Sequence, residues 1–179
     1  MSNPSSAEER DDQESGATRR QVMADETQGQ LPTPDPALQK LDRFVGTWSM
    51  EGHPVGTDEV TIKGETTFRW LAGGFFLEQR GHLNFMGLEL ESLELIGYDP
   101  ETGTFPSTVF ANIGPQPLPY RWEVEGDELR ISVSYGPLDA MFTGRFAEDG
   151  QSFGGGWRPN SGADETINVP YDIGGRRLR

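Results

Sequence analysis

From Trp48 onward, the sequence repeatedly alternates apolar and polar side chains with the period of two that is typical of β-strands. The clearest segment places Ile62, Phe68 and Trp70 on one face, and charged side chains such as Lys63 and Arg69 on the other. No helical period interrupts the pattern after Trp48. The sequence therefore predicts an all-β fold for this part of the chain.

About ten alternating segments follow one another, separated by turn sequences rich in glycine, proline and aspartate. These turn sequences include Gly73–Gly74, Asp99–Gly103, Gly126–Asp127 and Asp149–Gly150. The regular spacing favours a single antiparallel up-and-down β-barrel, because closure leaves no exposed sheet edge in so long a meander. An immunoglobulin-like sandwich is the second choice.

A short helix is predicted immediately before the barrel. Asp35 can cap its N-terminus, Pro36 suits the first helical position, and Gly46 can end it. We expect the helix to plug one mouth of the barrel with an apolar face formed by Leu38, Leu41 and Val45.

The N-terminal segment has a different composition from the rest of the chain. Residues 1–36 are rich in Ser, Pro, Gln, Asp and Glu and contain few large apolar side chains. Such a segment buries too little surface to offset the entropy lost on ordering. We therefore predict a disordered tail over residues 1–36 and one barrel domain over residues 37–179.

The formal net charge of −14 argues against nucleic acid and anionic membrane surfaces as partners, because both are recognised by clustered basic side chains. The chain has no cysteine, so disulfides and thiolate metal sites are excluded. The acidic N-terminus does not resemble a signal peptide, and the apolar run Trp70–Leu77 is too short to span a bilayer. These features predict a cytoplasmic protein.

The motif Gly46-Thr47-Trp48 at the head of an all-β run resembles the start of calycin-type barrels, which include lipocalins, fatty-acid-binding proteins and nitrobindin-like proteins. Further stretches are similar to an uncharacterised bacterial calycin-like family, a domain of unknown function: Thr67–Trp70, Gly73–Leu77, Leu95–Pro100, and Tyr171 with basic residues behind it. This resemblance implies a barrel with an internal cavity. It also implies that Trp48 packs against a basic side chain of the last strand, either Arg176 or Arg177.

The nitrobindin-like branch binds haem through a histidine close to the C-terminus. Here the only histidines are His53 and His82, and none follows residue 82. Because this chain lacks the C-terminal histidine, an organic ligand is a better prediction than haem. We expect no cofactor.

The polar side chains Glu78, Arg80, His82 and Asn84 share one face of a predicted strand. If this face points into the barrel, it supplies an acid, a cation and a group that titrates near neutrality. The opposite face, with Leu77, Leu83 and Phe85, is the better core candidate. The pattern alone therefore favours a solvent-exposed position for the four polar side chains.

Glu89, Glu91 and Glu94 form an acidic ladder on the next predicted strand. Glu94 breaks the period of two, and no aspartate- and glycine-rich loop accompanies the ladder, so we predict no metal site. A solvent-exposed edge with a bulge near Ser92 explains the pattern better.

The predicted function is to bind a small apolar or amphipathic molecule in the barrel. Arg80 or Arg158 in the lumen would suit a carboxylate head group. The alternative is a small-barrel enzyme of the lyase, isomerase or cyclase type that uses Glu78, Arg80 or His82. The predicted ligand-binding residues are Trp70, Arg80, His82, Trp122, Phe142 and Trp157.

Overall fold

The predicted strand alternation corresponds to a closed barrel in the computed structural model, which describes residues 32–178. Each strand pairs antiparallel with its neighbours in sequence, and β1 closes the barrel against β10. The predicted fold class is confirmed. The strands are β1 (Gly46–Pro54), β2 (Ile62–Trp70), β3 (Leu77–Phe85), β4 (Leu88–Ile96), β5 (Phe105–Ala111), β6 (Leu118–Glu125), β7 (Glu128–Tyr135), β8 (Leu138–Phe146), β9 (Ser152–Pro159) and β10 (Tyr171–Arg177).

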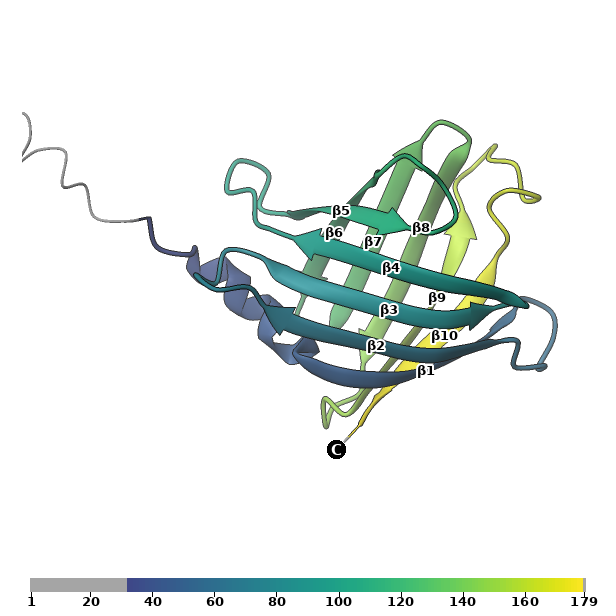
Figure 1. Cartoon of the computed structure of the whole chain (residues 1–179), viewed down its shortest axis with the longest axis horizontal. Coiled ribbons are helices and arrows are strands. Elements are labelled where there is room, and N and C mark those ends of the chain that lie inside the picture. Colours follow the sequence, from purple (N-terminus) through teal and green to yellow (C-terminus); the bar gives the residue numbers. More distant parts are fainter. Residues whose placement is uncertain (1–31, 179) are drawn as a thin grey trace, which may run out of the picture. The chain divides into compact units, whose positions relative to one another are not determined.

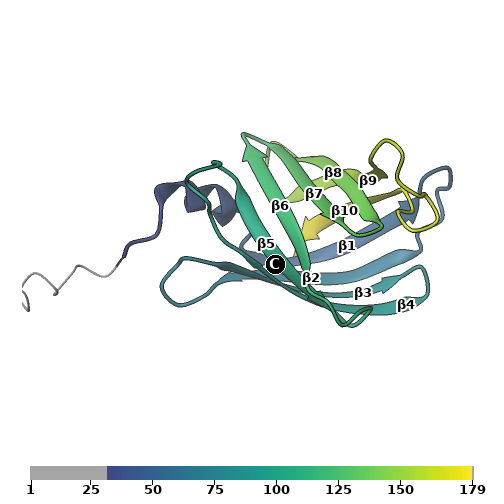
Figure 2. The ribbon, with the colours of Figure 1, turned by 90° about the horizontal axis from the view of Figure 1, so that it is seen from above.

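The barrel wall forms two curved layers whose strands cross. Figure 1 shows β1–β4 as the front layer and β7–β10 behind it at a steep angle. The helix η1 (Pro36–Phe44) lies at the end of the barrel where β1 begins, which we call the closed end (Figure 1, Figure 2). The opposite end carries the hairpin turns after β1, β3, β5 and β7, and we call it the open end.

The helix η1 is a 3-10 helix that begins as predicted. The side chain of Asp35 accepts a hydrogen bond from the backbone N–H of Ala37 at 2.8 Å. The predicted apolar face is wrong at one position, because Phe44 is buried in place of Val45, which is 36% exposed. A 3-10 helix has three residues per turn, so residue 44 follows residues 38 and 41 on the same face.

The closed end is packed with aromatic rings around Phe44. The Phe44 ring lies 5.5 Å from that of Phe68, 5.4 Å from that of Trp122 and 4.9 Å from that of Phe146, between centroids. Trp48 is fully buried beside this cluster. The helix therefore seals this end with side chains, as its predicted role as a plug requires.

The pairing of β3 with β4 is continuous, from Leu77 opposite Ile96 to Phe85 opposite Leu88. The predicted bulge near Ser92 is therefore wrong. Without a bulge, strict alternation turns Leu90, Ser92, Glu94 and Ile96 toward the barrel interior. Glu94 is accordingly 5% exposed, and its predicted place on a solvent-exposed edge is also wrong.

Residues 1–31 of the predicted tail lie outside the described residues, so the tail and the domain boundary stay predictions. Within residues 32–178, no helix combines the length and the apolar character needed to cross a membrane.

Candidate functional site in the barrel lumen

The barrel encloses a cavity of about 210 Å³ above the aromatic cluster of the closed end. One wall is apolar and includes Ile131, Phe142 and Trp157. Ile113, in the loop between β5 and β6, also lines the cavity and is 58% exposed, so the cavity opens to solvent at this point. The wall formed by β2, β3 and β4 carries the polar side chains Thr66, Gln79, Ser92 and Glu94.

Glu94 is the acidic group of this cavity. Its Oε1 accepts a hydrogen bond from Ser107 Oγ at 2.5 Å and one from Trp122 Nε1 at 2.7 Å. Burial raises the pKa of Glu94 to about 7, and the two hydrogen bonds oppose this rise only in part. The carboxyl group can therefore gain or lose a proton near neutral pH.

Gln79 lies directly opposite Glu94 in the pairing of β3 with β4. Directly paired residues on one sheet face have neighbouring side chains. The Oε1 atom of Gln79 is buried, and no hydrogen-bond donor within the described part of the chain reaches it. Two oxygen-bearing side chains therefore lie side by side on the polar wall.

Two tyrosines complete the polar lining. Burial, with a contribution from the negative charge of Glu94, raises the pKa of Tyr120 to about 12. Burial also raises the pKa of Tyr171 strongly, with a contribution from Tyr120. Both phenols therefore stay protonated at neutral pH and offer hydroxyl groups to the lumen.

The outer face of β3 carries the polar set predicted from the sequence. The Glu78 carboxylate lies beneath two arginines, with Oε1 at 2.6 Å from Arg69 Nε and 3.0 Å from Arg80 Nε. Hydrogen bonds from Arg69 and Arg80 hold the pKa of Glu78 below its usual range. His82 Nε2 lies 3.6 Å from Glu89 Oε2, and Asn84 Nδ2 donates to Glu89 Oε1 at 2.6 Å. The set therefore forms two separate clusters of polar contacts on the outer face, one around Glu78 and one around Glu89.

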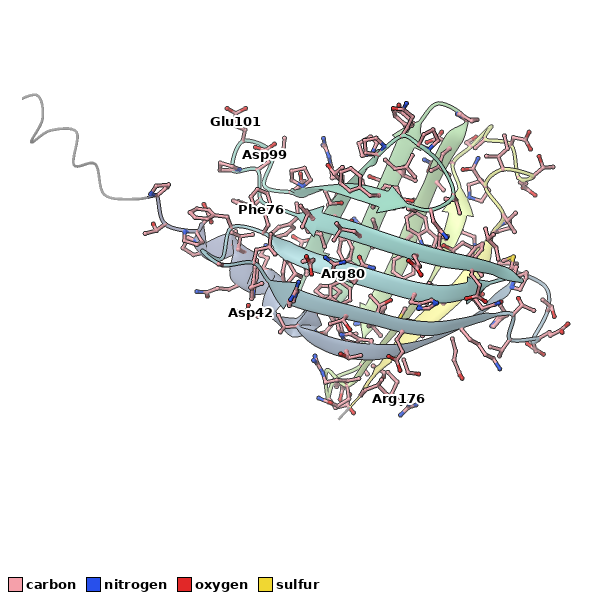
Figure 3. The ribbon with its side chains drawn as sticks, viewed as in Figure 1. Asp42, Phe76, Arg80, Asp99, Glu101 and Arg176 are labelled. Carbon is pink, nitrogen blue, oxygen red and sulfur yellow. The ribbon has the colours of Figure 1, made fainter. Side chains whose placement is uncertain are left out.

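Of the six predicted ligand-binding residues, Trp122, Phe142 and Trp157 line the cavity. Trp70 lies at the closed end, where its Nε1 donates to Asp42 Oδ1 at 2.8 Å. Arg80 and His82 point away from the lumen, with side chains 59% and 68% exposed, so a place for them inside the barrel is wrong. Figure 3 shows Arg80 on the outer face of the barrel. Leu77 and Leu83 take the inward positions of β3 because apolar side chains fill the core at lower free energy.

The lumen offers few side chains that could coordinate a metal ion or a haem iron. Among residues 32–178, no three histidine or acidic side chains come together in a group that could hold a metal ion. His53 follows the inward residue Gly52 on β1 and pairs with Asp172 on the outer side, and His82 is outward as well. Within the part of the chain that the structure describes, no imidazole therefore lines the cavity.

Comparison with known proteins places the chain in a family. A family model described as "Protein of unknown function (DUF1579)" matches residues 33–145, which run from the segment before η1 into β8. The chain belongs to the DUF1579 family. No curated protein was found to be similar in sequence.

One solved structure similar to this DUF1579 barrel is that of Rv2717c from M. tuberculosis. The two share 16% sequence identity with a TM-score of 0.52, and the match covers 82% of this chain and 99% of the other. At this identity the likeness concerns the fold alone.

Sequence reasoning missed Glu94, Gln79 and Tyr171 as lumen residues of this DUF1579 barrel. A signal for the first was present, because counting back in steps of two from the apolar Ile96 reaches Glu94, Ser92 and Leu90. A glutamate on the core face suggested a register break instead. The donors that satisfy its Oε1, Ser107 and Trp122, come from β5 and β6 and become visible only in the fold.

Proposed function

We propose that this DUF1579 barrel binds a small, mainly apolar molecule in its lumen. The observation that carries the proposal is the cavity of about 210 Å³ that remains although aromatic side chains fill the closed end. Small barrels are commonly filled by their own side chains, so a remaining space with an opening to solvent favours a ligand.

The size of the cavity limits the ligand to about one substituted ring. An apolar cavity of about 150 Å³ accommodates benzene. Drug-sized ligands occupy about 300–1,000 Å³, which exceeds the space available here. Phe142, Trp157 and Ile131 offer the apolar contact surface for such a ring.

The prediction that the ligand carries a carboxylate head group is no longer supported. It depended on an arginine in the lumen, and Arg80 lies outside, as does Arg158, which pairs with Asp172 at 2.6 Å. No described residue that lines the cavity is basic, whereas Glu94 is acidic. A second carboxylate beside Glu94 would meet like-charge repulsion at neutral pH.

The enzyme alternative drew on Glu78, Arg80 and His82. All three lie on the outer face, where Arg80 pairs with Glu78 and His82 lies beside Glu89, and they do not converge on the cavity. The binding function therefore accounts for more of the observed geometry than catalysis by this set.

Toluene and benzyl alcohol are suitable probes for this proposal. Ligand entry should shift the NMR signal of the Trp122 indole N–H, because this group lies at the cavity wall. Ala111→Trp should abolish the shift by filling the cavity, since Ala111 lines it. The matched control is Thr108→Trp, on the exposed side of the same strand, and it should leave binding unchanged. Equal binding by both variants would contradict a site in the lumen.

A further inference from the structure

The Gln79–Glu94 pair leaves hydrogen-bond acceptors without donors inside the lumen. Ser107 and Trp122 both donate to Glu94 Oε1, and no described residue donates to its Oε2. Gln79 Oε1 is buried without a donor. A buried acceptor without a partner destabilises the site, so a site with such atoms is suited to a ligand that supplies donors.

We propose that the Gln79–Glu94 pair recognises a small primary amine in its protonated form, bound within the lumen. This inference rests on the proposed ligand-binding function. A primary ammonium group carries three N–H donors, so it can serve Glu94 Oε2 and Gln79 Oε1 together. An alcohol carries one donor and leaves one of the two acceptors without a partner.

The charge of the lumen favours a cation. An ionised carboxylate that is removed from water needs a positive partner, and Glu94 has none, because no lining residue among those described is basic. A bound ammonium ion would supply the partner. Each ion then offsets the desolvation of the other.

The aromatic lining supports the same ligand chemistry. Tyr120 packs 5.8 Å from Trp157, and Phe142 also lies 5.8 Å from Trp157, between ring centroids. Aromatic faces attract cations, most strongly where water is excluded. The net charge of −14 further raises the local concentration of cations near the protein.

The groups that titrate around this site are few. Glu94 has a pKa of about 7, whereas burial keeps Tyr120 and Tyr171 protonated well above neutral pH. The other polar groups near Glu94 are Gln79, Thr66, Ser92, Ser107 and the Trp122 indole, none of which titrates here. Amine affinity should therefore increase as the pH rises through about 7, and alcohol affinity should not.

The test compares benzylamine, benzyl alcohol and toluene by calorimetry on the full chain, with the Trp122 N–H signal as a second readout. We expect benzylamine to bind about ten to a hundred times more tightly than benzyl alcohol at about pH 8, as hydrogen bonds to a charged group predict. Glu94→Gln should remove this preference, and Gln79→Leu should reduce it. Glu91→Gln, on the exposed face of the same strand, is the matched control.

Proton release gives an independent readout. Below about pH 7, benzylamine binding should release a proton from Glu94, which appears as a binding enthalpy that depends on the buffer. Equal affinity for all three probes, or tighter binding of the alcohol, would overturn the amine inference and leave lumen binding intact. Failure of all three to shift the Trp122 signal would overturn the proposed function itself.

Discussion

The guanidinium carbon of Arg177 lies 4.3 Å from the centre of the Trp48 ring. Trp48 donates from its Nε1 to the backbone oxygen of Phe44 at 2.7 Å, and Arg177 donates to the backbone oxygens of Arg43, at 2.6 Å, and Val45. The two side chains therefore join the last strand to η1 and to the first strand. This contact closes the barrel at the end that the helix covers.

Trp48→Ala should lower the free energy of unfolding by about 3–5 kcal/mol, because it removes a fully buried aromatic ring. Combined with Arg177→Met in a double-mutant cycle, it should reveal a coupling of about 0.5–2 kcal/mol. Urea denaturation of the four proteins measures both quantities.

Arg176→Met is the matched control for this cycle. Arg176 is the neighbouring arginine on the same strand, but it is exposed and points away from the barrel wall (Figure 3). Its coupling to Trp48 should be indistinguishable from zero. A coupling equal to that of Arg177 would show that the contact is not specific.

Gly155→Ala should destabilise the protein by about 1–3 kcal/mol, as for overpacking of a core. A Cβ at residue 155 would overlap the backbone oxygen of Thr143 and would lie 2.5 Å from Gly144 Cα and 2.7 Å from Phe142 Cζ. The backbones of β8 and β9 therefore approach each other closely at this residue. Thermal unfolding measures the loss.

Gly154→Ala provides the comparison, because a Cβ at residue 154 would meet nothing nearer than 4.0 Å. It should change the melting temperature much less than Gly155→Ala. An equal decrease in melting temperature for the two variants would indicate that the effect comes from backbone flexibility and not from crowding against Phe142.

Asn168→Ala should cost about 1–3 kcal/mol, because the buried amide anchors the loop between β9 and β10. Its Oδ1 accepts from the backbone N–H of Asp139 at 2.8 Å, and its Nδ2 donates to the backbone oxygens of Pro137 and Asp164 at 3.0 Å each. Hydrogen exchange should become faster at the Asp139 amide. Unchanged exchange at Asp139 would contradict an anchoring role.

The architecture was predictable because alternation with a period of two is a local property that each strand carries independently. The same reasoning could have selected Arg177 over Arg176 as the partner of Trp48, because Arg177 shares the inward face of β10 with Ile173 and Gly175. The position of Phe44 was harder. It depends on a 3-10 rather than an α-helical period, which the residue pattern alone did not distinguish.

The polar side of the site could not be predicted from the residue pattern, because the hydrogen-bond donors to Glu94 come from other strands of the barrel. Alternation turns Glu94 on β4 inward, and there Ser107 on β5 and Trp122 on β6 donate to it. A sequence shows which face a residue occupies but not which donors meet it there. For the same reason, Arg80 and His82 were plausible lumen residues until their partners on the outer face, Glu78 and Glu89, were visible.

Glu94→Gln should change how stability depends on pH. Burial raises the pKa of Glu94 in the folded chain to about 7 from its ordinary value of 4.5, so the folded state binds the proton more tightly than the unfolded state. The resulting stabilisation is fully present below about pH 4.5 and is lost as the pH rises through about 7. Relative to the glutamine variant, the parent should lose roughly 2–3 kcal/mol between about pH 5 and about pH 8.

Urea denaturation at several pH values measures this difference. His53 and His82 are present in both proteins, so any contribution that they make cancels in the comparison. Glu91→Gln should run parallel to the parent, because its side chain is on the exposed face of β4. Parallel curves for the parent and Glu94→Gln would mean that Glu94 has the same pKa folded and unfolded, and that its carboxylate is solvated in the lumen.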